Sequence, residues 1–311
     1  MSRIRTEGLV LGQQGAQIED GPSDSPSPEE LEALRLRAAT ALEQGLGFVD
    51  RHGGELARLR VRGVLGAEPL DECTRRISEA QNPDGSFPPL GLGEAGAPGL
   101  TEAHAGQLDS RCLGTLEALI VLADLGMHHH PCVEGAAVFM HSIQLEDGSW
   151  GSPEVGGESR IFATGMVAGL LGRTRVVRPE VLDAAGEFLA ELFTPERISG
   201  RNWEALTSFG VFFTNVGHDQ ADSALQWIGR ELERGFRMRV YEAGLTLRTL
   251  LHCQTLAIPG AGLAPFDLLT DLLGEQGADG GFAELTSGSD LTRVEPTLDA
   301  ILGTLRLCDS L

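Results

Sequence analysis

The sequence predicts an all-α protein whose helices form six antiparallel pairs closed into a ring, an (α/α)6 toroid. Two observations lead to this fold. The 311 residues contain twelve segments with helical patterning and no convincing run of the alternating kind that marks β-strands. A short motif also recurs three times, each time after a helical segment, which marks an internal repeat. Closing the pairs into a ring removes the exposed ends that an open stack of pairs would have.

The repeated motif has the form Gln-x-x-Asp-Gly-x-aromatic and occupies residues 81–87, 144–150 and 276–282. Glycine accepts a positive φ angle and aspartate hydrogen-bonds the turn backbone, so each Asp-Gly pair predicts a turn. We expect the aromatic ring to pack under the turn and the Gln amide to tie the preceding helix end to the next loop. The third copy follows the second at about twice the first spacing, which indicates a degenerate unit between them.

The chain divides into an N-terminal arm and one helical domain. Residues 1–28 are rich in Gly, Ser, Pro and Gln and are expected to be a flexible arm, followed by the toroid domain over 29–311. Helices are expected at 29–49, 54–65, 70–82, 109–126, 131–145, 158–173, 179–195, 203–216, 220–235, 239–256, 262–276 and 291–308. Pro-Glu pairs mark starts, because Pro suits the first turn and an acid suits the helix dipole there. Ends fall at Gly or Asp-Gly.

A second repeat concerns the helices that follow the turns. Arg160, Arg239 and Arg293 open three of these segments, and Asp109 stands at the aligned place in the first. The segments are rich in Ala, Gly, Leu and Val, as expected of an inner ring. The alternate helices, such as 179–195 and 220–235, carry more charge and suit an outer ring.

Composition excludes several classes of function. The net charge is −21, which argues against nucleic acid and anionic membranes as partners, since both repel an acidic surface. All 24 basic residues are arginine, so lysine Schiff-base chemistry and a P-loop lysine are excluded. We find no signal peptide and no apolar run of 18 residues. Five widely spaced cysteines fit a reducing cytoplasm better than a disulfide framework.

The Gln-x-x-Asp-Gly-x-aromatic motif resembles the repeat of squalene–hopene and oxidosqualene cyclases. The same toroid occurs in protein prenyltransferase β subunits and in thioester domains of complement-like proteins. The resemblance covers about residues 29–308 and implies the fold more than the activity. The Asp-x-Asp-Asp motif of the cyclases is missing, Glu295, Pro296 and Thr297 stand where a zinc-binding His is wanted, and Gly274-Glu275-Gln276 lacks the thioester cysteine.

Arg160, Arg239 and Arg293 are candidates for an anion site. A closed ring would place them at one end of a central cavity, and arginine binds phosphate or carboxylate through two parallel hydrogen bonds. The alternative is that each pairs with a local acid such as Glu158 or Glu242.

Acidic residues in apolar helices are the candidate catalytic groups: Glu295, Asp299, Glu242 and Asp109. Glu295 and Asp299 are four residues apart and share one helix face. A carboxylic acid in an apolar cavity has a raised pKa and can protonate an alkene or epoxide. Helix capping, or pairing with the repeated arginines, is the alternative.

Aromatic residues are the candidate substrate wall. Trp203, Phe209, Phe212, Phe213, Tyr241 and Phe162 are expected either to line an apolar pocket, where ring faces stabilise a carbocation, or to pack in the core. His128-His129-His130 with Cys132 is interpreted as a surface loop, because adjacent side chains rarely converge on one ion. No metal and no cofactor are predicted.

The function predicted from these features is that of a terpene-cyclase-like enzyme of secondary metabolism. It would cyclise or isomerise an apolar, isoprenoid-like substrate by acid catalysis, with the arginines holding an anionic group. Two alternatives stay open: prenyl transfer from a prenyl diphosphate, and a non-catalytic toroid that binds a ligand or a partner.

Overall fold

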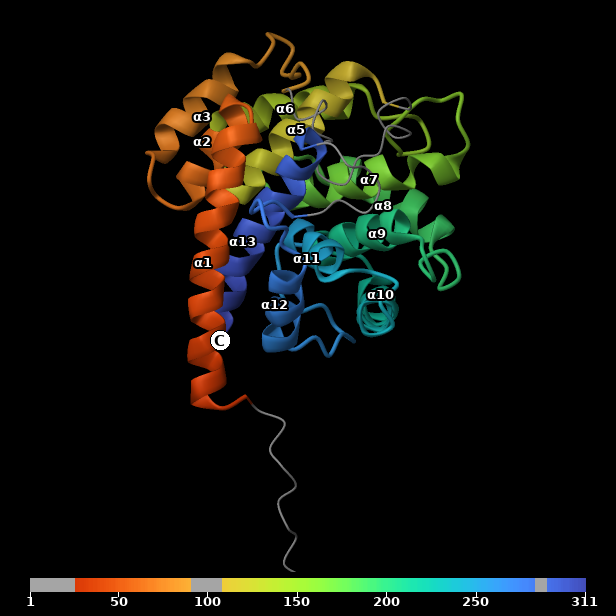
Figure 1. Cartoon of the computed structure of the whole chain (residues 1–311). Coiled ribbons are helices and arrows are strands. Elements are labelled where there is room, and N and C mark those ends of the chain that lie inside the picture. Colours follow the sequence, from red (N-terminus) through yellow and green to blue (C-terminus); the bar gives the residue numbers. More distant parts are fainter. Residues whose placement is uncertain (1–25, 91–107, 283–289) are drawn as a thin grey trace, which may run out of the picture.

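The computed structural model describes residues 26–90, 108–282 and 290–311. Over these ranges the chain forms twelve α-helices (Figure 1), and no described residue belongs to a β-strand. The helices are α1 (Pro28–His52), α2 (Glu55–Val64), α3 (Leu70–Glu79), α5 (Ser110–Asp124), α6 (Pro131–Ser142), α7 (Gly157–Gly172), α8 (Pro179–Leu192), α9 (Trp203–Asn215), α10 (Ala221–Arg237), α11 (Ala243–His252), α12 (Pro265–Gly274) and α13 (Val294–Ser310). The prediction of an all-α chain is confirmed.

All twelve expected helices are present, with local differences at their ends. The helix expected from residue 239 begins at Ala243, because Arg239 has a φ of 55° and interrupts the backbone after α10. The helix expected from residue 262 begins at Pro265, which occupies the first turn. The expected arm falls mostly on residues 1–25, outside the described ranges, but Ser27 belongs to the fold, since it caps α1 in a reciprocal pair with Glu30.

From α5 onward, every second helix of the chain is buried on nearly all sides, whereas α2 buries one face. Residues 112–123 of α5 and 161–171 of α7 are buried without interruption, and most of α9, α11 and α13 is buried too. The helices between them, such as α8 and α10, bury one face and expose charged residues on the other. Apolar sequences without a polar face require this burial on all sides.

The buried helices α7, α9, α11 and α13 run parallel to one another. Gly165 and Gly169 of α7 meet residues 208 and 211 of α9, where a side chain larger than hydrogen would collide with the neighbouring backbone. In α9, Trp203 donates to the carbonyl of Leu245, Thr207 hydrogen-bonds Thr249, and Gly210 lies against Cys253 at the end of α11. Arg248 and Gln254 then meet residues 299 and 306 of α13. In each pair, residue numbers rise together along both helices, so the carboxyl ends of all four helices lie at one end of the molecule.

The three turn motifs join neighbouring helices in the same way. The amide nitrogens of Gln81, Gln144 and Gln276 each donate to the carbonyl of the motif's own glycine, at 2.9 Å in every copy. Each also donates to a backbone carbonyl on another helix: Cys132 of α6, Val181 of α8 and Ala41 of α1, at 2.8–2.9 Å. The Gln side chain thus ties one half-exposed helix to the next one around the molecule, beyond the neighbouring loop that the sequence indicated.

The first residues of the helices after the motifs complete the repeat. The motif aspartates Asp84, Asp147 and Asp279 pair with Arg111, Arg160 and Arg293 at 3.0, 2.9 and 2.7 Å. Four residues after each arginine, Thr115, Thr164 and Thr297 accept a hydrogen bond from the N–H of the motif's buried aromatic residue. In the first copy of the repeat, the arginine that pairs with the motif aspartate is therefore Arg111. The sequence alignment had placed Asp109 at this position, two residues earlier.

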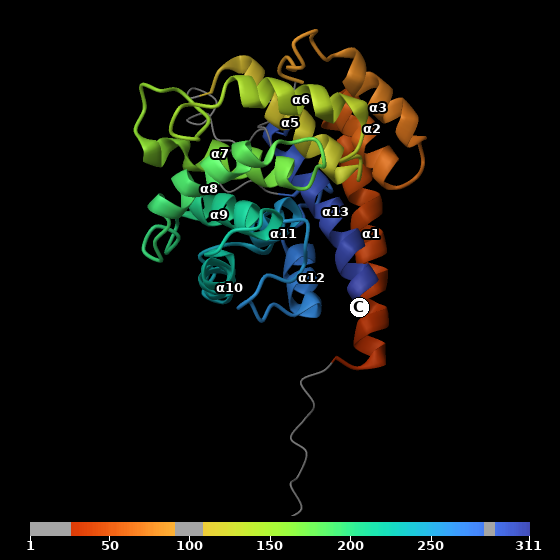
Figure 2. The ribbon, with the colours of Figure 1, turned by 180° about the vertical axis from the view of Figure 1, so that it is seen from behind.

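The last turn motif, residues 276–282, contacts α1, the first helix of the chain. Gly280 has a φ of +91° and lies against the backbone of Gln44 in α1. Gly45 packs against Ile301 and Thr297 of α13. Both views of the ribbon show α1 beside α13, whose end carries the C-terminus (Figures 1 and 2).

Candidate functional site

A network of buried charged side chains connects α2, α5, α11 and α13. Arg60 of α2 is 1% exposed and donates to the carboxylates of Asp124 in α5 and Glu295 in α13, the latter at 2.7 Å. Its guanidinium lies 3.9 Å from Asp299, which accepts a hydrogen bond of 2.7 Å from Arg248 of α11. Four helices therefore meet through ion pairs that are almost fully withdrawn from water. We call Arg60, Glu117, Asp124, Arg248, His252, Glu295 and Asp299 the buried charge cluster.

The buried charge cluster has more carboxyl groups than cations. Two arginines face four carboxyl groups, and burying an unbalanced negative charge is costly. Desolvation raises the pKa of Glu295 and of Asp124, against the lowering effect of Arg60. A group with a raised pKa holds its proton to a higher pH than an ordinary carboxyl group does.

Glu117 is the carboxyl group of the cluster that no cation contacts. It lies in the middle of α5 and is fully buried. Its Oε2 accepts a hydrogen bond of 2.9 Å from the backbone N–H of Leu90, while its Oε1 has no hydrogen-bond partner among the described residues. Desolvation, with a smaller contribution from the charge of Glu295, raises the pKa of Glu117 to about 7. A carboxyl group of this kind is protonated over much of the neutral pH range and is able to donate a proton.

His252 is the neutral member of the cluster. It is 5% exposed at the end of α11, and its Nε2 has no hydrogen-bond partner among the described residues. Burial lowers its pKa to about 4, an effect that nearby Asp299 opposes and Arg248 and Arg60 reinforce. At neutral pH its imidazole therefore adds no positive charge to balance the carboxyl groups.

The four predicted acids divide into two pairs. Glu295 and Asp299 lie in the buried charge cluster, on one face of α13 as their spacing predicts. Asp109 and Glu242 are exposed at the starts of α5 and α11. Asp109 caps α5 by accepting a hydrogen bond of 2.9 Å from the N–H of Arg111. These two carboxylates face solvent.

The three predicted arginines pair with three different acids. Arg160 and Arg293 bind Asp147 and Asp279 of their own turn motifs, and Arg239 lies 2.9 Å from Asp271 of α12. The paired arginine holds the pKa of Asp279 down at about 2. The pairing is local, as in the alternative that the sequence left open, although the partners differ from those named there: Glu158 pairs with Arg197.

The predicted aromatic residues are all buried, in different parts of the molecule. Phe209, Phe212 and Phe213 of α9 pack edge-on with Phe193 and His218, beside α8. Trp203 donates its indole N–H to Thr249 at 2.8 Å, and the Tyr241 hydroxyl donates to the carbonyl of Gly200 at 2.6 Å. This arrangement matches core packing between helices.

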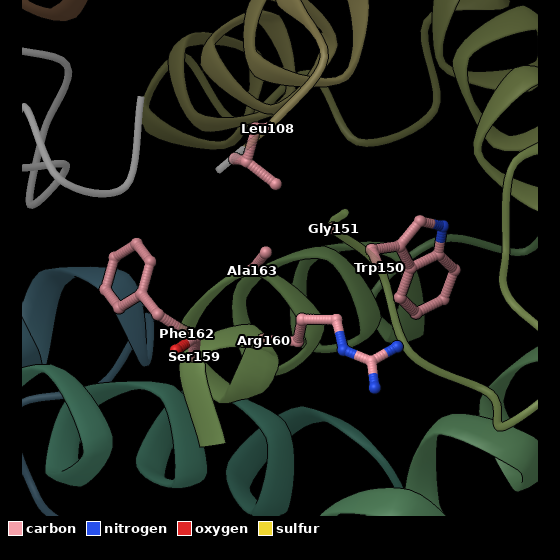
Figure 3. Close-up of a pocket in the computed structure, with 7 residues that line it drawn as sticks. All are labelled: Leu108, Trp150, Gly151, Ser159, Arg160, Phe162 and Ala163. Atoms are coloured by element: carbon pink, nitrogen blue, oxygen red, sulfur yellow. The ribbon is translucent and has the colours of Figure 1, made fainter. Parts of the chain in front are cut away.

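Phe162 lines a small cleft at the start of α7 (Figure 3). Leu108 faces Phe162 and Ala163 across the cleft, and Trp150, Gly151, Ser159 and Arg160 complete its wall. The cleft combines apolar side chains with one guanidinium whose Nε has no hydrogen-bond partner in the described part of the chain. Of the predicted substrate-binding residues, the structure brings only Arg160 and Phe162 together here.

Other classes of site are not found in the described ranges. No group of three or more His, Cys, Asp or Glu side chains there is placed to hold a metal ion. His130 instead caps α6, and its ring lies 2.9 Å from the Cys132 sulfur. None of the described helices has the length and apolar character that crossing a membrane requires.

Sequence reasoning missed Arg60, Glu117, Asp124 and Arg248. The signal for Glu117 was a single acid inside the apolar run of residues 112–123. For Arg60 it was the spacing of three arginines on α2, since Arg58 and Arg62 share a face that Arg60 does not.

Comparison with known proteins gives a likeness of fold alone. The sequence matches no protein-family model and no curated protein. A crystal structure of a protein from Actinoplanes is similar over 88% of this chain and 99% of its own, with a TM-score of 0.52 and 14% sequence identity. At that identity the likeness extends to the fold and carries no information about activity.

Proposed function

We propose that the twelve helices form a closed ring of six pairs, with α2, α5, α7, α9, α11 and α13 inside. Three features support this arrangement. Five of the inside helices, α5, α7, α9, α11 and α13, are buried on nearly all sides. Successive members contact one another, and the Gln276 motif ties α12 to α1 across 235 residues of sequence. The buried charge cluster would then lie inside the ring.

We further propose that the chain is an enzyme that acts by acid catalysis on an apolar small molecule. The observation that carries this proposal is Glu117, a fully buried carboxyl group with a pKa of about 7 and one oxygen that no described residue hydrogen-bonds. Perturbed carboxyl groups of this kind concentrate at functional sites. The Actinoplanes structure adds no support, since its likeness concerns the fold.

In the proposed reaction Glu117 is the proton donor. Its O–H bond breaks, a C–H bond forms at one alkene carbon of the substrate, and the positive charge develops on the neighbouring carbon. Loss of a different proton to the carboxylate then yields the isomerised or cyclised product and restores the acid. Glu295, whose Oε1 also has no hydrogen-bond partner within residues 26–90, 108–282 and 290–311, is the second carboxyl group able to receive that proton. The isoprenoid class of substrate rests on the motif resemblance.

Solvent deuterium tests this proposal directly. The protein is incubated in D₂O with a panel of isoprenoid alkenes, alcohols and diphosphates, and products are analysed by mass spectrometry. Protonation by an exchanged Glu117 places one deuterium in the product. We expect Glu117→Gln to abolish turnover and Glu187→Gln, at an exposed position of α8, to leave it unchanged.

The remaining outcomes select the alternatives. Release of diphosphate with a product that carries no deuterium would indicate prenyl transfer. Ligand-dependent thermal shifts without any product would indicate a binding protein. Retention of full activity by Glu117→Gln would exclude Glu117 as the proton donor.

We also propose a cytoplasmic location. The support is that all five cysteines are free thiols, and four of them are buried. Unpaired thiols are maintained in reducing compartments.

A further inference from the structure

Two arginines at the carboxyl ends of the buried helices have no acidic partner. Arg173 follows the end of α7, and Arg306 lies in the last turns of α13. Both are half-buried. In the described part of the chain, neither is within ion-pair distance of a carboxylate, whereas Arg160, Arg197, Arg248 and Arg293, with similar or greater burial, all have one.

The polar groups around the two arginines are amide oxygens. Arg173 donates to Oδ1 of Asn215, which ends α9, at 3.3 Å. Arg306 donates to Oε1 of Gln254, which follows α11, at 3.3 Å. The Nε of Arg173 is buried and has no hydrogen-bond partner in the described ranges. Both guanidiniums thus keep donor capacity that neutral amides do not use.

The helix packing brings these residues to the same end of the molecule. Helices α7, α9, α11 and α13 run parallel, so residues 173, 215, 254 and 306 all lie at the same end of the molecule. Burial, with a further contribution from the charge of Arg306, lowers the pKa of Arg173, and burial with the charge of Arg173 lowers the pKa of His128. The positive charge of Arg306 contributes to lowering the pKa of Asp124, but Asp124 already forms an ion pair with Arg60.

Two half-buried arginines without an ion-pair partner among the described residues are unexpected in a chain with 45 acids and 24 arginines. Helix carboxyl ends favour positive charge, but that effect is small at an exposed site, and it does not require two such arginines at one end of the molecule. Gln254 also adopts a left-handed φ of 57°, which is uncommon outside glycine and directs its side chain at this end of α11.

We propose that Arg173 and Arg306, with Asn215 and Gln254, form a binding site for an oxyanion, either a carboxylate or a phosphate group. An oxyanion between the guanidiniums would neutralise both and accept the hydrogen bonds that the amides leave unused. The site is separate from the arginines at the amino ends of the buried helices, and it does not rest on the proposed acid catalysis.

Calorimetric titration of the full chain with inorganic phosphate, and separately with succinate, tests this site and distinguishes the two anions. We expect saturable binding of one of them. Arg173→Gln and Arg306→Gln should each weaken it at least ~10-fold, equivalent to about 1.4 kcal/mol. Arg175→Gln, at an exposed neighbouring position, should leave it unchanged.

Circular dichroism of each variant separates loss of binding from loss of fold. Double substitution should abolish binding while the helical spectrum persists. The proposal is overturned if the wild-type chain binds neither anion saturably, or if binding persists in both single variants.

Discussion

Glu117 shows how a single residue's place in its helix sets its chemistry. It lies seven residues into α5, between turns whose side chains are all buried, so its carboxyl group cannot reach water. Asp109, at the start of the same helix, faces solvent and caps the backbone. A carboxyl group therefore has a raised pKa at the buried position of Glu117 and serves as a helix cap at the exposed position of Asp109.

The raised pKa of Glu117 predicts a specific dependence of stability on pH. Its pKa rises from the ordinary value of 4.5 to about 7 on folding, so the folded state binds the proton more tightly than the unfolded state does. This group's contribution is fully present below pH 4.5 and is lost as the pH rises through 7. The loss is at most roughly 3 kcal/mol, from about 1.4 kcal/mol per pKa unit.

Glu117→Gln removes this titration. We expect the stability of the variant relative to wild type to increase between pH 5 and pH 8, as measured by urea unfolding at both values. Glu187→Gln should show no such change. An equal difference between wild type and Glu117→Gln at both pH values would mean that Glu117 titrates normally.

At the scale of the elements, periodicity and turn chemistry were sufficient to predict all twelve helices. The Asp-Gly turns worked as a signal because Gly85, Gly148 and Gly280 each adopt a positive φ where a neighbouring backbone leaves no space for a side chain. The pairing of helices was harder to predict. The partner of Gln276 is 235 residues away, and no local pattern specifies a contact of that range.

The acids of α13 in the buried charge cluster could be predicted from sequence, but their arginine partners could not, again because the partners lie far away in the sequence. Glu295 and Asp299 share a helix face by spacing alone, but their partners Arg60 and Arg248 come from other helices. The expectation of one degenerate unit between the second and third motifs was also too simple. Two connections that lead from a half-exposed helix to a buried one, 193–202 and 238–242, lie between these motifs, and neither carries the motif.

Gly280 provides a test of how the last motif fixes α1. A Cβ atom there would lie 2.3 Å from the carbonyl oxygen of Gln44, and the φ of +91° is strained for any other residue. We expect Gly280→Ala to lower the free energy of unfolding by roughly 1–3 kcal/mol, and hydrogen exchange to increase first in α1. Gly274→Ala is the matched control, because no neighbouring group lies within 4 Å of the place that its Cβ atom would occupy. Equal stability of the two variants would contradict this role for the turn.

Over the whole molecule, Arg60 is the residue on which the most distant segments depend. It joins α2 to α5 and α13, which are separated from it by 64 and 235 residues. Burial opposes its charge, but the surrounding carboxylates outweigh that effect and raise its pKa. The guanidinium therefore remains charged, and the network it holds is electrostatic at a point where apolar packing would be expected.

Arg60→Met tests this dependence. It leaves Asp124 and Glu295 buried without their cation, and breaking one side of a buried ion pair costs about 3–5 kcal/mol. Arg62→Met, at an exposed position of the same helix, should cost less than about 1 kcal/mol. Both are measured by urea unfolding at neutral pH.

Lowering the pH toward 5 should reduce the loss of stability in Arg60→Met, because carboxyl groups with raised pKa values then take up protons and no longer need the cation. If the deficit is small at neutral pH, or grows as the pH falls, the carboxyl groups are already neutral in the wild-type protein and Arg60 does not hold them as anions.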